Sequence, residues 1–204
     1  TDIYEKLLKD FPKKSDLYFE MVELYIAEQE YAKALQTIYE IENVFGPTEG
    51  LAVYAYRILQ TLGRQEEALE HLHEYNSRYS SPYVLTILAD LALTEYDDTT
   101  AIRYYDEAID LDASYSPALI GKAEACRISR RYDEYFPALD AYVKNTAAGP
   151  EEKAEYLTAL IEKSDPNFVL RFKSKLDTAL LGFAQAHPED RLVYNLRGMY
   201  YLYT

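Results

Sequence analysis

The stretch TTAIRYYDEAIDLD, residues 99–112, decides the fold expected for this chain. Ala101, Tyr105 and Ala108 follow one another at spacings of four and three residues. Residues at these spacings are neighbours on one face of a helix, so the stretch predicts an amphipathic helix. An alanine at the centre of the buried face indicates that another helix approaches closely there.

Three other stretches repeat this pattern at a nearly constant interval: YAKALQTIYEIE (31–42), RQEEALEHLHEY (64–75) and RRYDEYFPALDAY (130–142). The central residues are Ala34, Ala68, Ala101 and Tyr135, at intervals of 34, 33 and 34 residues. About sixteen residues before each of them lies another helical face, seen most fully in SDLYFEMVELYIAEQE (15–30). The polar joint between the two faces is long enough only for an antiparallel turn. Each repeat is therefore predicted to be a pair of antiparallel helices.

The period and the pattern resemble the tetratricopeptide repeat, whose 34-residue signature is W-x2-L-G-x2-Y, A-x3-F and a closing proline. The chain departs from it in four ways: it has no tryptophan, glycine stands at the glycine position only as Gly198, Tyr135 stands at an alanine position, and the closing prolines are displaced to Pro47, Pro82 and Pro117. The resemblance implies an all-α fold, a right-handed superhelical solenoid of stacked antiparallel helix pairs with about 11–12 helices.

The pattern also predicts how the chain is organised. Residues 1–14, with Tyr4, Leu7, Leu8 and Phe11 on one face, are predicted to be the tail of a preceding helical unit. Four repeats follow, at about 15–48, 49–81, 82–115 and 116–149. Residues 150–190 break the rhythm and predict an irregular helical pair, with one longer helix from about Asn167 to Ala186. Residues 191–204 are the expected first helix of a further repeat, and both ends indicate a fragment of a larger protein.

Composition restricts the classes of partner. The chain has 21 basic and 35 acidic residues and a formal net charge of −14, which argues against nucleic acid as a partner because phosphate binding needs clustered Lys and Arg. No apolar run approaches the ~20 residues of a membrane span. The single cysteine, Cys126, excludes an intramolecular disulfide. An exported, envelope-associated (periplasmic) location and a cytoplasmic one both stay open.

The residues capable of chemistry do not form a recognisable catalytic or metal motif. His71 and His73 are two residues apart on a predicted helix, so they point in different directions and cannot share one ion. Cys126 falls on an inward face, where it acts as a small apolar residue, and His187 falls at a helix end. We therefore expect no catalytic activity, no metal and no cofactor.

The first helices of stacked pairs are expected to line a concave groove. The predicted binding residues in this groove are Phe19, Glu23, Arg57, Tyr83, Thr86, Asp90, Glu124 and Arg127. Aromatic and charged side chains in this arrangement suit an extended peptide or a partner helix. Some members of the family capture a C-terminal carboxylate with Lys and Asn at the equivalent places, and this chain lacks that set.

The predicted function is a non-enzymatic scaffold for protein–protein interaction that binds a peptide or partner segment in the concave groove. Two alternatives stay open. One is a structural module that self-associates through its irregular C-terminal part. The other is an envelope-associated receptor or nutrient-uptake component, since tyrosine rings can stack on sugars.

Overall fold

The computed structural model describes residues 3, 6, 10, 11 and 13–204, and this part of the chain is all-α, with twelve helices and no strand. The predicted face of Tyr4, Leu7 and Leu8 lies outside the described residues. The chain divides into two compact units, residues 1–88 and 89–204.

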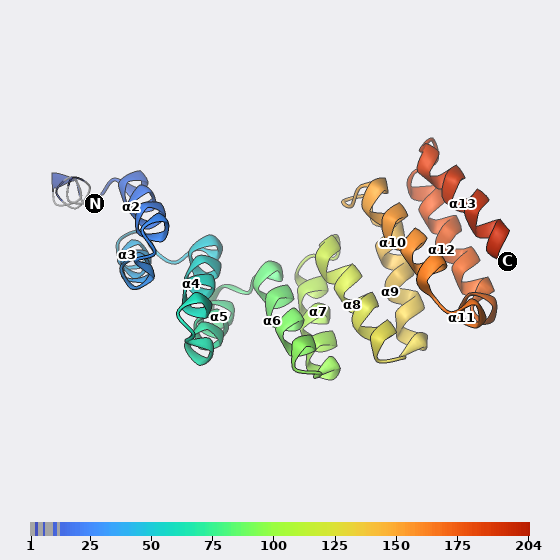
Figure 1. Ribbon diagram of the computed structural model, residues 1–204, viewed down its shortest axis with the longest axis horizontal. Helices are drawn as coiled ribbons and strands as arrows, with labels where there is room; N and C mark the ends of the chain where they lie inside the picture. Colours follow the sequence, from blue (N-terminus) through green and yellow to red (C-terminus); the bar gives the residue numbers. More distant parts are fainter. Residues whose placement is uncertain (1–2, 4–5, 7–9, 12) are drawn as a thin grey trace. The chain divides into compact units, whose positions relative to one another are not determined.

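The first unit is built from helical hairpins (Figure 1). Helix α2 (Ser15–Ala27) pairs with α3 (Tyr31–Phe45), and α4 (Glu49–Thr61) pairs with α5 (Gln65–Tyr79). Helix α3 also packs on α4, so one hairpin stacks on the next. Helix α6 (Pro82–Thr94) begins in this unit and ends in the second.

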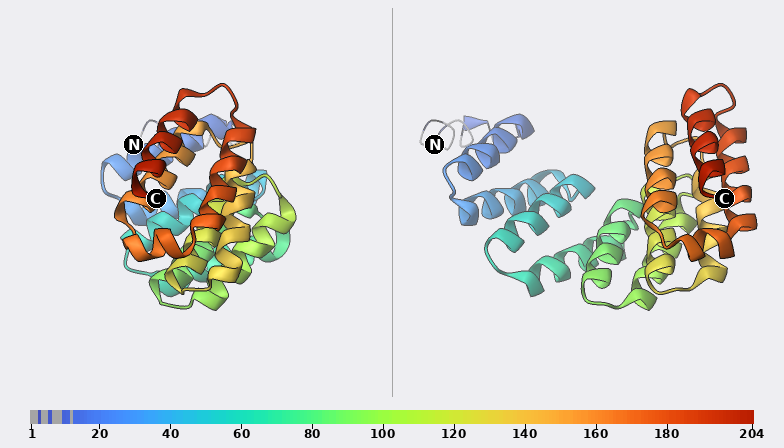
Figure 2. Two further views of the ribbon diagram at one scale, coloured as in Figure 1. Left: turned by 90° about the vertical axis from the view of Figure 1, so that its right-hand side faces the viewer. Right: turned by 45° about the vertical axis from the view of Figure 1, so that its right-hand side comes forward.

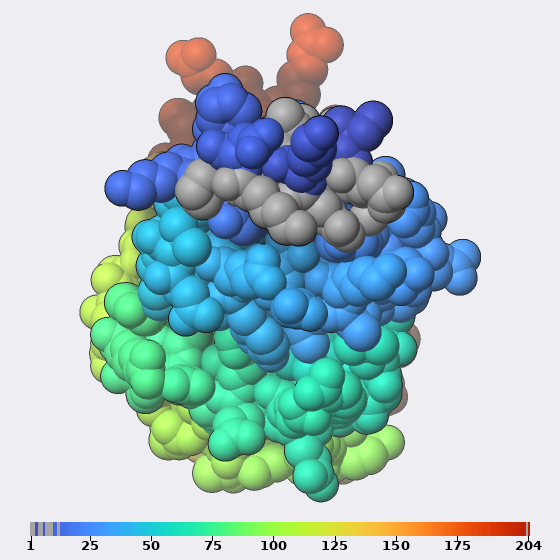
Figure 3. Space-filling view, turned by 90° about the vertical axis from the view of Figure 1, so that its left-hand side faces the viewer, coloured from blue at the N-terminus to red at the C-terminus, as the bar shows by residue number. Residues whose placement is uncertain are grey.

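Small residues lie where the helices of each hairpin meet. Ala34 and Ala68 are fully buried, and so are Ile38 and Leu72, which lie four residues further on. At the N-terminal end of the unit, α2 and α3 face the viewer in Figure 3. This end keeps apolar side chains exposed, including Phe19, Val44 and Phe45.

The second unit continues with α7 (Asp98–Leu111), α8 (Ser116–Ile128), α9 (Tyr132–Lys144), α10 (Pro150–Lys163), α11 (Pro166–Arg171), α12 (Lys173–Ala186) and α13 (Arg191–Tyr203). Helix α8 pairs with α9 and packs on α7. Beyond them α9 packs on α12 and α10 packs on α13, and both views of Figure 2 show α12 beside α13. The second unit is therefore also a stack of helices.

A residue in the left-handed conformation recurs in successive repeats, in the turn between the two helices of each repeat. Gln29, Gly63, Tyr96 and Arg130 have φ angles of 60°, 74°, 62° and 58°, and they follow one another at 34, 33 and 34 residues. Residues with a side chain rarely adopt this conformation. Its recurrence without glycine at three of these four positions indicates that the packing of the two helices fixes the turn.

The irregular segment differs from its prediction. The single helix expected from Asn167 to Ala186 is interrupted at Phe172, whose ψ of 18° departs from the helical value of about −42°. The ring of Phe172 lies 4.8 Å from that of Tyr132, 4.9 Å from that of Phe136 and 5.0 Å from that of Phe168, centroid to centroid. This aromatic cluster holds the break against the start of α9, and no proline or glycine in the sequence announces it.

Close packing between α7 and α8 depends on Gly121. The Tyr105 ring is buried against this glycine, and a Cβ atom added to Gly121 would lie 2.6 Å from Tyr105 Cζ. Real Cβ atoms do not approach so closely. Gly121 therefore provides the space that the Tyr105 ring fills.

The second unit also buries a cation, Lys153. This side chain on α10 is fully buried, and its ammonium donates a hydrogen bond to the backbone carbonyl of Asn145. Its Nζ lies 2.9 Å from Nε2 of His187, one repeat further along the chain. With the ammonium as donor, Nε2 of His187 is the acceptor, so His187 is neutral. Burial and then the charge of Lys153 lower the pKa of His187, and burial also lowers the pKa of Lys153.

We expect acid to weaken the second unit through His187. Because its pKa is lower in the folded state, the unfolded chain takes up the proton first as the pH falls below about 6.5. The contribution of His187 to stability is present above that pH and is lost as the pH falls toward the pKa of His187 in the folded protein. Thermal melting of the wild type and of His187→Gln between about pH 7.5 and pH 5 measures it.

The melting temperature of His187→Gln should fall less over this range than that of the wild type. Gln185→Asn, at an exposed non-titrating residue on α12 of the same unit, is the control and should keep the full dependence. Equal pH dependence in all three proteins would exclude the contribution of His187.

Candidate ligand-binding surfaces

In the first unit, two charged residues of the predicted groove are held by tyrosine hydroxyls from the next repeat. Tyr54 on α4 donates a hydrogen bond to the Glu23 carboxylate on α2. Nη2 of Arg57 on α4 lies 3.5 Å from the hydroxyl of Tyr83 on α6. All four side chains are at least partly exposed, so these contacts orient the charges without burying them.

In the second unit the equivalent residues have the same kind of neighbour. Tyr105 donates to the Asp90 carboxylate. Glu124 accepts a hydrogen bond from Tyr156 on α10 and two from Arg127, at 2.8 and 2.7 Å. Burial alone would raise the pKa of Glu124, but the hydrogen bonds from Arg127 and Tyr156 outweigh it and hold the pKa below its usual value. Glu124 is therefore a carboxylate at neutral pH.

These four charged residues occupy one position of the repeat. Glu23, Arg57, Asp90 and Glu124 follow one another at 34, 33 and 34 residues, and each contacts a tyrosine hydroxyl. We call them the first-helix charges. All four were predicted from the sequence as binding residues, but their contacts with Tyr54, Tyr105 and Tyr156 were not. The signal was present for two of them, because Tyr54 and Tyr156 lie 31 and 32 residues after the carboxylates they contact.

The remaining predicted residues differ in exposure. Phe19 on α2 is 48% exposed. Thr86 is only 8% exposed, and its hydroxyl donates to the carbonyl of Pro82 at 2.8 Å. Thr86 therefore supports its own helix and has no free surface for a ligand, because its position on α6 turns it inward.

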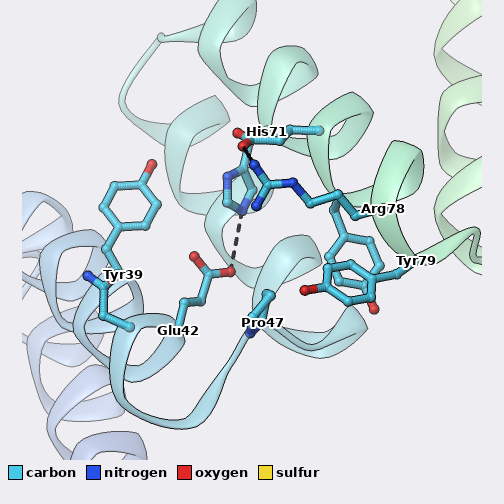
Figure 4. Close-up of a pocket in the computed structure, with 9 residues that line it drawn as sticks. Tyr39, Glu42, Pro47, His71, Arg78 and Tyr79 are labelled. Atoms are coloured by element: carbon cyan, nitrogen blue, oxygen red, sulfur yellow. Dashed lines mark hydrogen bonds and ion pairs between the residues drawn. The ribbon is translucent and has the colours of Figure 1, made fainter.

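A pocket of about 440 Å³ lies in the first unit between the second helices α3 and α5 (Figure 4). Tyr39 and Glu42 come from α3, Pro47 from the joint, and His71 and Arg78 from α5. Nε2 of His71 lies 3.7 Å from Glu42 Oε1. Burial raises the pKa of Glu42 and lowers that of His71, which favours their uncharged forms. This pocket can accept a polar group beside aromatic rings. From the sequence, His71 was considered only as a metal ligand together with His73, and the pocket was not predicted.

Another pocket, of about 550 Å³, lies in the second unit where the repeat rhythm breaks. We call it the basic pocket. It is lined by Arg127, Arg130, Tyr132, Lys163, Ser164, Asp165, Asn167, Phe168, Arg171 and Phe172. Of these residues only Arg127 was predicted from the sequence to bind a partner, as part of the concave groove.

The described residues lack two further features. Among them, no helix combines the length and the apolar character needed to cross a membrane. In the same part of the chain, no three His, Cys, Asp or Glu side chains are grouped so as to hold a metal ion.

Comparison with known proteins relates the chain to solved structures. No family model and no curated protein matches the sequence. YrrB, described as a TPR protein with an unusual peptide-binding site, matches with a TM-score of 0.54 and 12% identity over 96% of this chain and 97% of its own. PilF of Pseudomonas aeruginosa matches with a TM-score of 0.60 and 16% identity over 96% of this chain and 86% of its own.

The APC/C hetero-tetramer Cut9–Hcn1 matches with a TM-score of 0.54 and 16% identity over 97% of this chain. This chain spans 38% of the length of the matched Cut9–Hcn1 chain. At these identities the likeness concerns the fold, and it agrees with the 34-residue period and the stacked hairpins. The chain has the fold of the tetratricopeptide-repeat proteins.

Proposed function

We propose that this protein is a non-enzymatic scaffold that binds a peptide or partner segment through the first-helix charges, those of each unit forming a binding surface of their own. The observation that carries the proposal is that Glu23, Arg57, Asp90 and Glu124 are each oriented by a tyrosine hydroxyl. Polar groups held in place before binding lose little freedom when a ligand arrives. The Glu23 and Asp90 carboxylates also have lone pairs that one tyrosine does not fill, whereas Glu124 is already paired with Arg127.

The chemistry of these positions indicates the kind of segment that fits. Three of the four residues are carboxylates, which accept hydrogen bonds from backbone amides, hydroxyls and basic side chains. Phe19 offers an exposed apolar surface on the same helix as Glu23. The segment we expect is extended, has donors facing the carboxylates and carries an apolar side chain. YrrB, which has this fold, is described as having a peptide-binding site.

A random-sequence peptide library selected on the wild-type protein tests this function. For the peptides that it enriches, we expect Arg57→Glu/Tyr83→Ala to weaken binding about tenfold or more, because the double change reverses one charge and removes the ring that orients it. Fluorescence anisotropy with labelled peptides gives the dissociation constants.

Arg78→Glu/Tyr79→Ala on α5 is the matched control, because it changes the same two residue types on a second helix. The control should bind within about twofold of the wild type. Loss of binding in the control alone would move the site to the pocket of Figure 4 and contradict the proposal. A library that yields no enriched peptide, with a mass that rises with concentration, would favour the self-assembly function instead.

A further inference from the structure

Positive charge is concentrated around the basic pocket in a chain that carries an excess of acid. The pocket has four cationic side chains, Arg127, Arg130, Lys163 and Arg171, and one carboxylate, Asp165. The whole chain has 21 basic residues against 35 acidic ones. The local charge therefore has the opposite sign to the net charge of the protein.

Three of these four cations are not neutralised by the protein itself. Arg127 is paired with Glu124, but in the described part of the chain none of Arg130, Lys163 and Arg171 forms an ion pair with a carboxylate. Asp165 accepts a hydrogen bond from the backbone amide of Asn167 at 2.7 Å, at the start of α11. The one carboxylate among the lining residues thus caps the N-terminus of α11.

Aromatic rings form the apolar part of the pocket. The rings of Tyr132 and Phe172 are 4.8 Å apart, and those of Phe168 and Phe172 are 5.0 Å apart, centroid to centroid. All three rings are partly exposed. The Arg171 guanidinium lies 5.1 Å from the Phe172 ring centroid, which fixes a cation beside the apolar surface.

The pocket exists because separate elements meet there. Arg130 occupies the left-handed turn between α8 and α9, Lys163 is the last residue of α10, and Arg171 is the last residue of α11. The break at Phe172 ends α11 and turns the aromatic cluster toward this junction. An uninterrupted helix from Asn167 to Ala186 would lack this break, so the pocket depends on it.

We propose that the basic pocket binds an acidic peptide segment of a partner protein, with an aromatic or aliphatic side chain of that segment packed on Tyr132, Phe168 and Phe172. Carboxylates of the segment pair with Arg130, Lys163 and Arg171. Charge complementarity selects an acidic occupant, and the apolar rings select a segment that carries a hydrophobic side chain between its acids. The residues that bind the segment, Arg130, Lys163 and Arg171, are distinct from the first-helix charges, although Arg127, which also lines the pocket, pairs with Glu124 at 2.7 Å.

A blocked heptapeptide with three acidic residues on each side of a phenylalanine is a direct probe. We expect it to bind the wild-type protein, and we expect Arg130→Glu/Lys163→Glu to weaken that binding about tenfold or more. Both side chains are exposed, so the variant should keep the circular dichroism spectrum and melting temperature of the wild type. Isothermal titration calorimetry at low salt measures the dissociation constants.

Lys175→Glu/Arg191→Glu is the matched control, because it changes the net charge equally through exposed residues on α12 and α13 of the same unit. Binding by this control within about twofold of the wild type supports the pocket. Equal weakening in both variants would overturn it, since the peptide would then respond to net charge. Failure of the heptapeptide to bind would also overturn it.

Three further readouts identify the occupant. A heptapeptide with glycine in place of phenylalanine should bind more weakly, and equal binding would overturn the role of the rings. Displacement by inorganic phosphate at the concentration of the peptide would overturn a peptide in favour of a small anion. If light scattering shows a dimer that Arg130→Glu/Lys163→Glu abolishes, the occupant is a second copy of this chain and the peptide proposal is overturned. None of these results bears on Arg57→Glu/Tyr83→Ala, so the two proposals fail separately.

Discussion

Replacing Tyr135 with alanine is expected to lower the free energy of unfolding of the second unit by about 3–5 kcal/mol. The Tyr135 side chain is fully buried on α9, with its ring centroid 4.8 Å from that of Phe136. Its hydroxyl lies 3.2 Å from the hydroxyl of Tyr156, which itself donates to Glu124. The alanine would leave a cavity of nearly the whole ring between packed helices. Urea denaturation followed by circular dichroism measures the loss.

This experiment distinguishes the stability effect predicted from the repeat pattern alone from the effect predicted from the packing around Tyr135. Alanine is the residue that the repeat pattern leads one to expect at this position, so the pattern by itself predicts that Tyr135→Ala is harmless. Tyr135→Phe keeps the ring and removes only one hydroxyl contact, so it should cost about 1 kcal/mol. A Tyr135→Ala protein as stable as the wild type would mean that the surrounding helices close over the space.

Gly121→Ala is expected to destabilise the same unit by about 1–2 kcal/mol, although alanine is the better helix former. The added Cβ would lie 2.6 Å from Tyr105 Cζ. The Tyr105 ring is buried and its hydroxyl donates a hydrogen bond to Asp90, so the ring is held in place. Overpacking costs about 1–3 kcal/mol, and for an approach this short we take the upper half of that range, about 2–3 kcal/mol, which exceeds the gain of about 1 kcal/mol from replacing a helical glycine. Urea denaturation again gives the difference.

Gly198→Ala is the matched control, because nothing lies within 4 Å of a Cβ atom added on α13. It should stabilise the protein by about 0.5–1 kcal/mol, through helix propensity alone. In a Tyr105→Leu background the ring is gone, and Gly121→Ala should become neutral or stabilising. Additive effects of the two changes would contradict a direct contact between them.

The stacked hairpins could be predicted from the sequence because each depends on local patterns. Buried positions at three- and four-residue spacing define each helix, and the 34-residue interval sets which faces stack. Ala34, Ala68 and Ala101 are fully buried in the structure, as residues at a close approach must be. The turn positions share the period, although only Gly63 among the four left-handed residues is a glycine.

The details of the candidate sites depend on contacts between elements, which the patterns do not contain. Thr86 lies on the expected helix but points inward, since a rotation of a few tens of degrees decides which flanking residue is buried. Nothing in the sequence marks the break at Phe172, because it results from ring packing against α9. The basic pocket was missed for the same reason: Arg130, Lys163 and Arg171 belong to different elements and lie 33 and 8 residues apart.

The tyrosine contacts of the first-helix charges also bear on how the array responds to a ligand. Tyr156 on α10 reaches back to Glu124 on α8, so one hydrogen bond spans the boundary between two repeats. In a repeat array, the contacts between neighbours set how cooperatively the repeats fold. A ligand that displaces Tyr156 from Glu124 breaks this hydrogen bond and weakens the contact between the two repeats. A ligand that binds beside Tyr156 leaves the hydrogen bond in place and strengthens that contact. Under the proposed function, we therefore expect occupancy at one repeat to change how cooperatively that repeat folds with its neighbour, without any change in the shape of the helices.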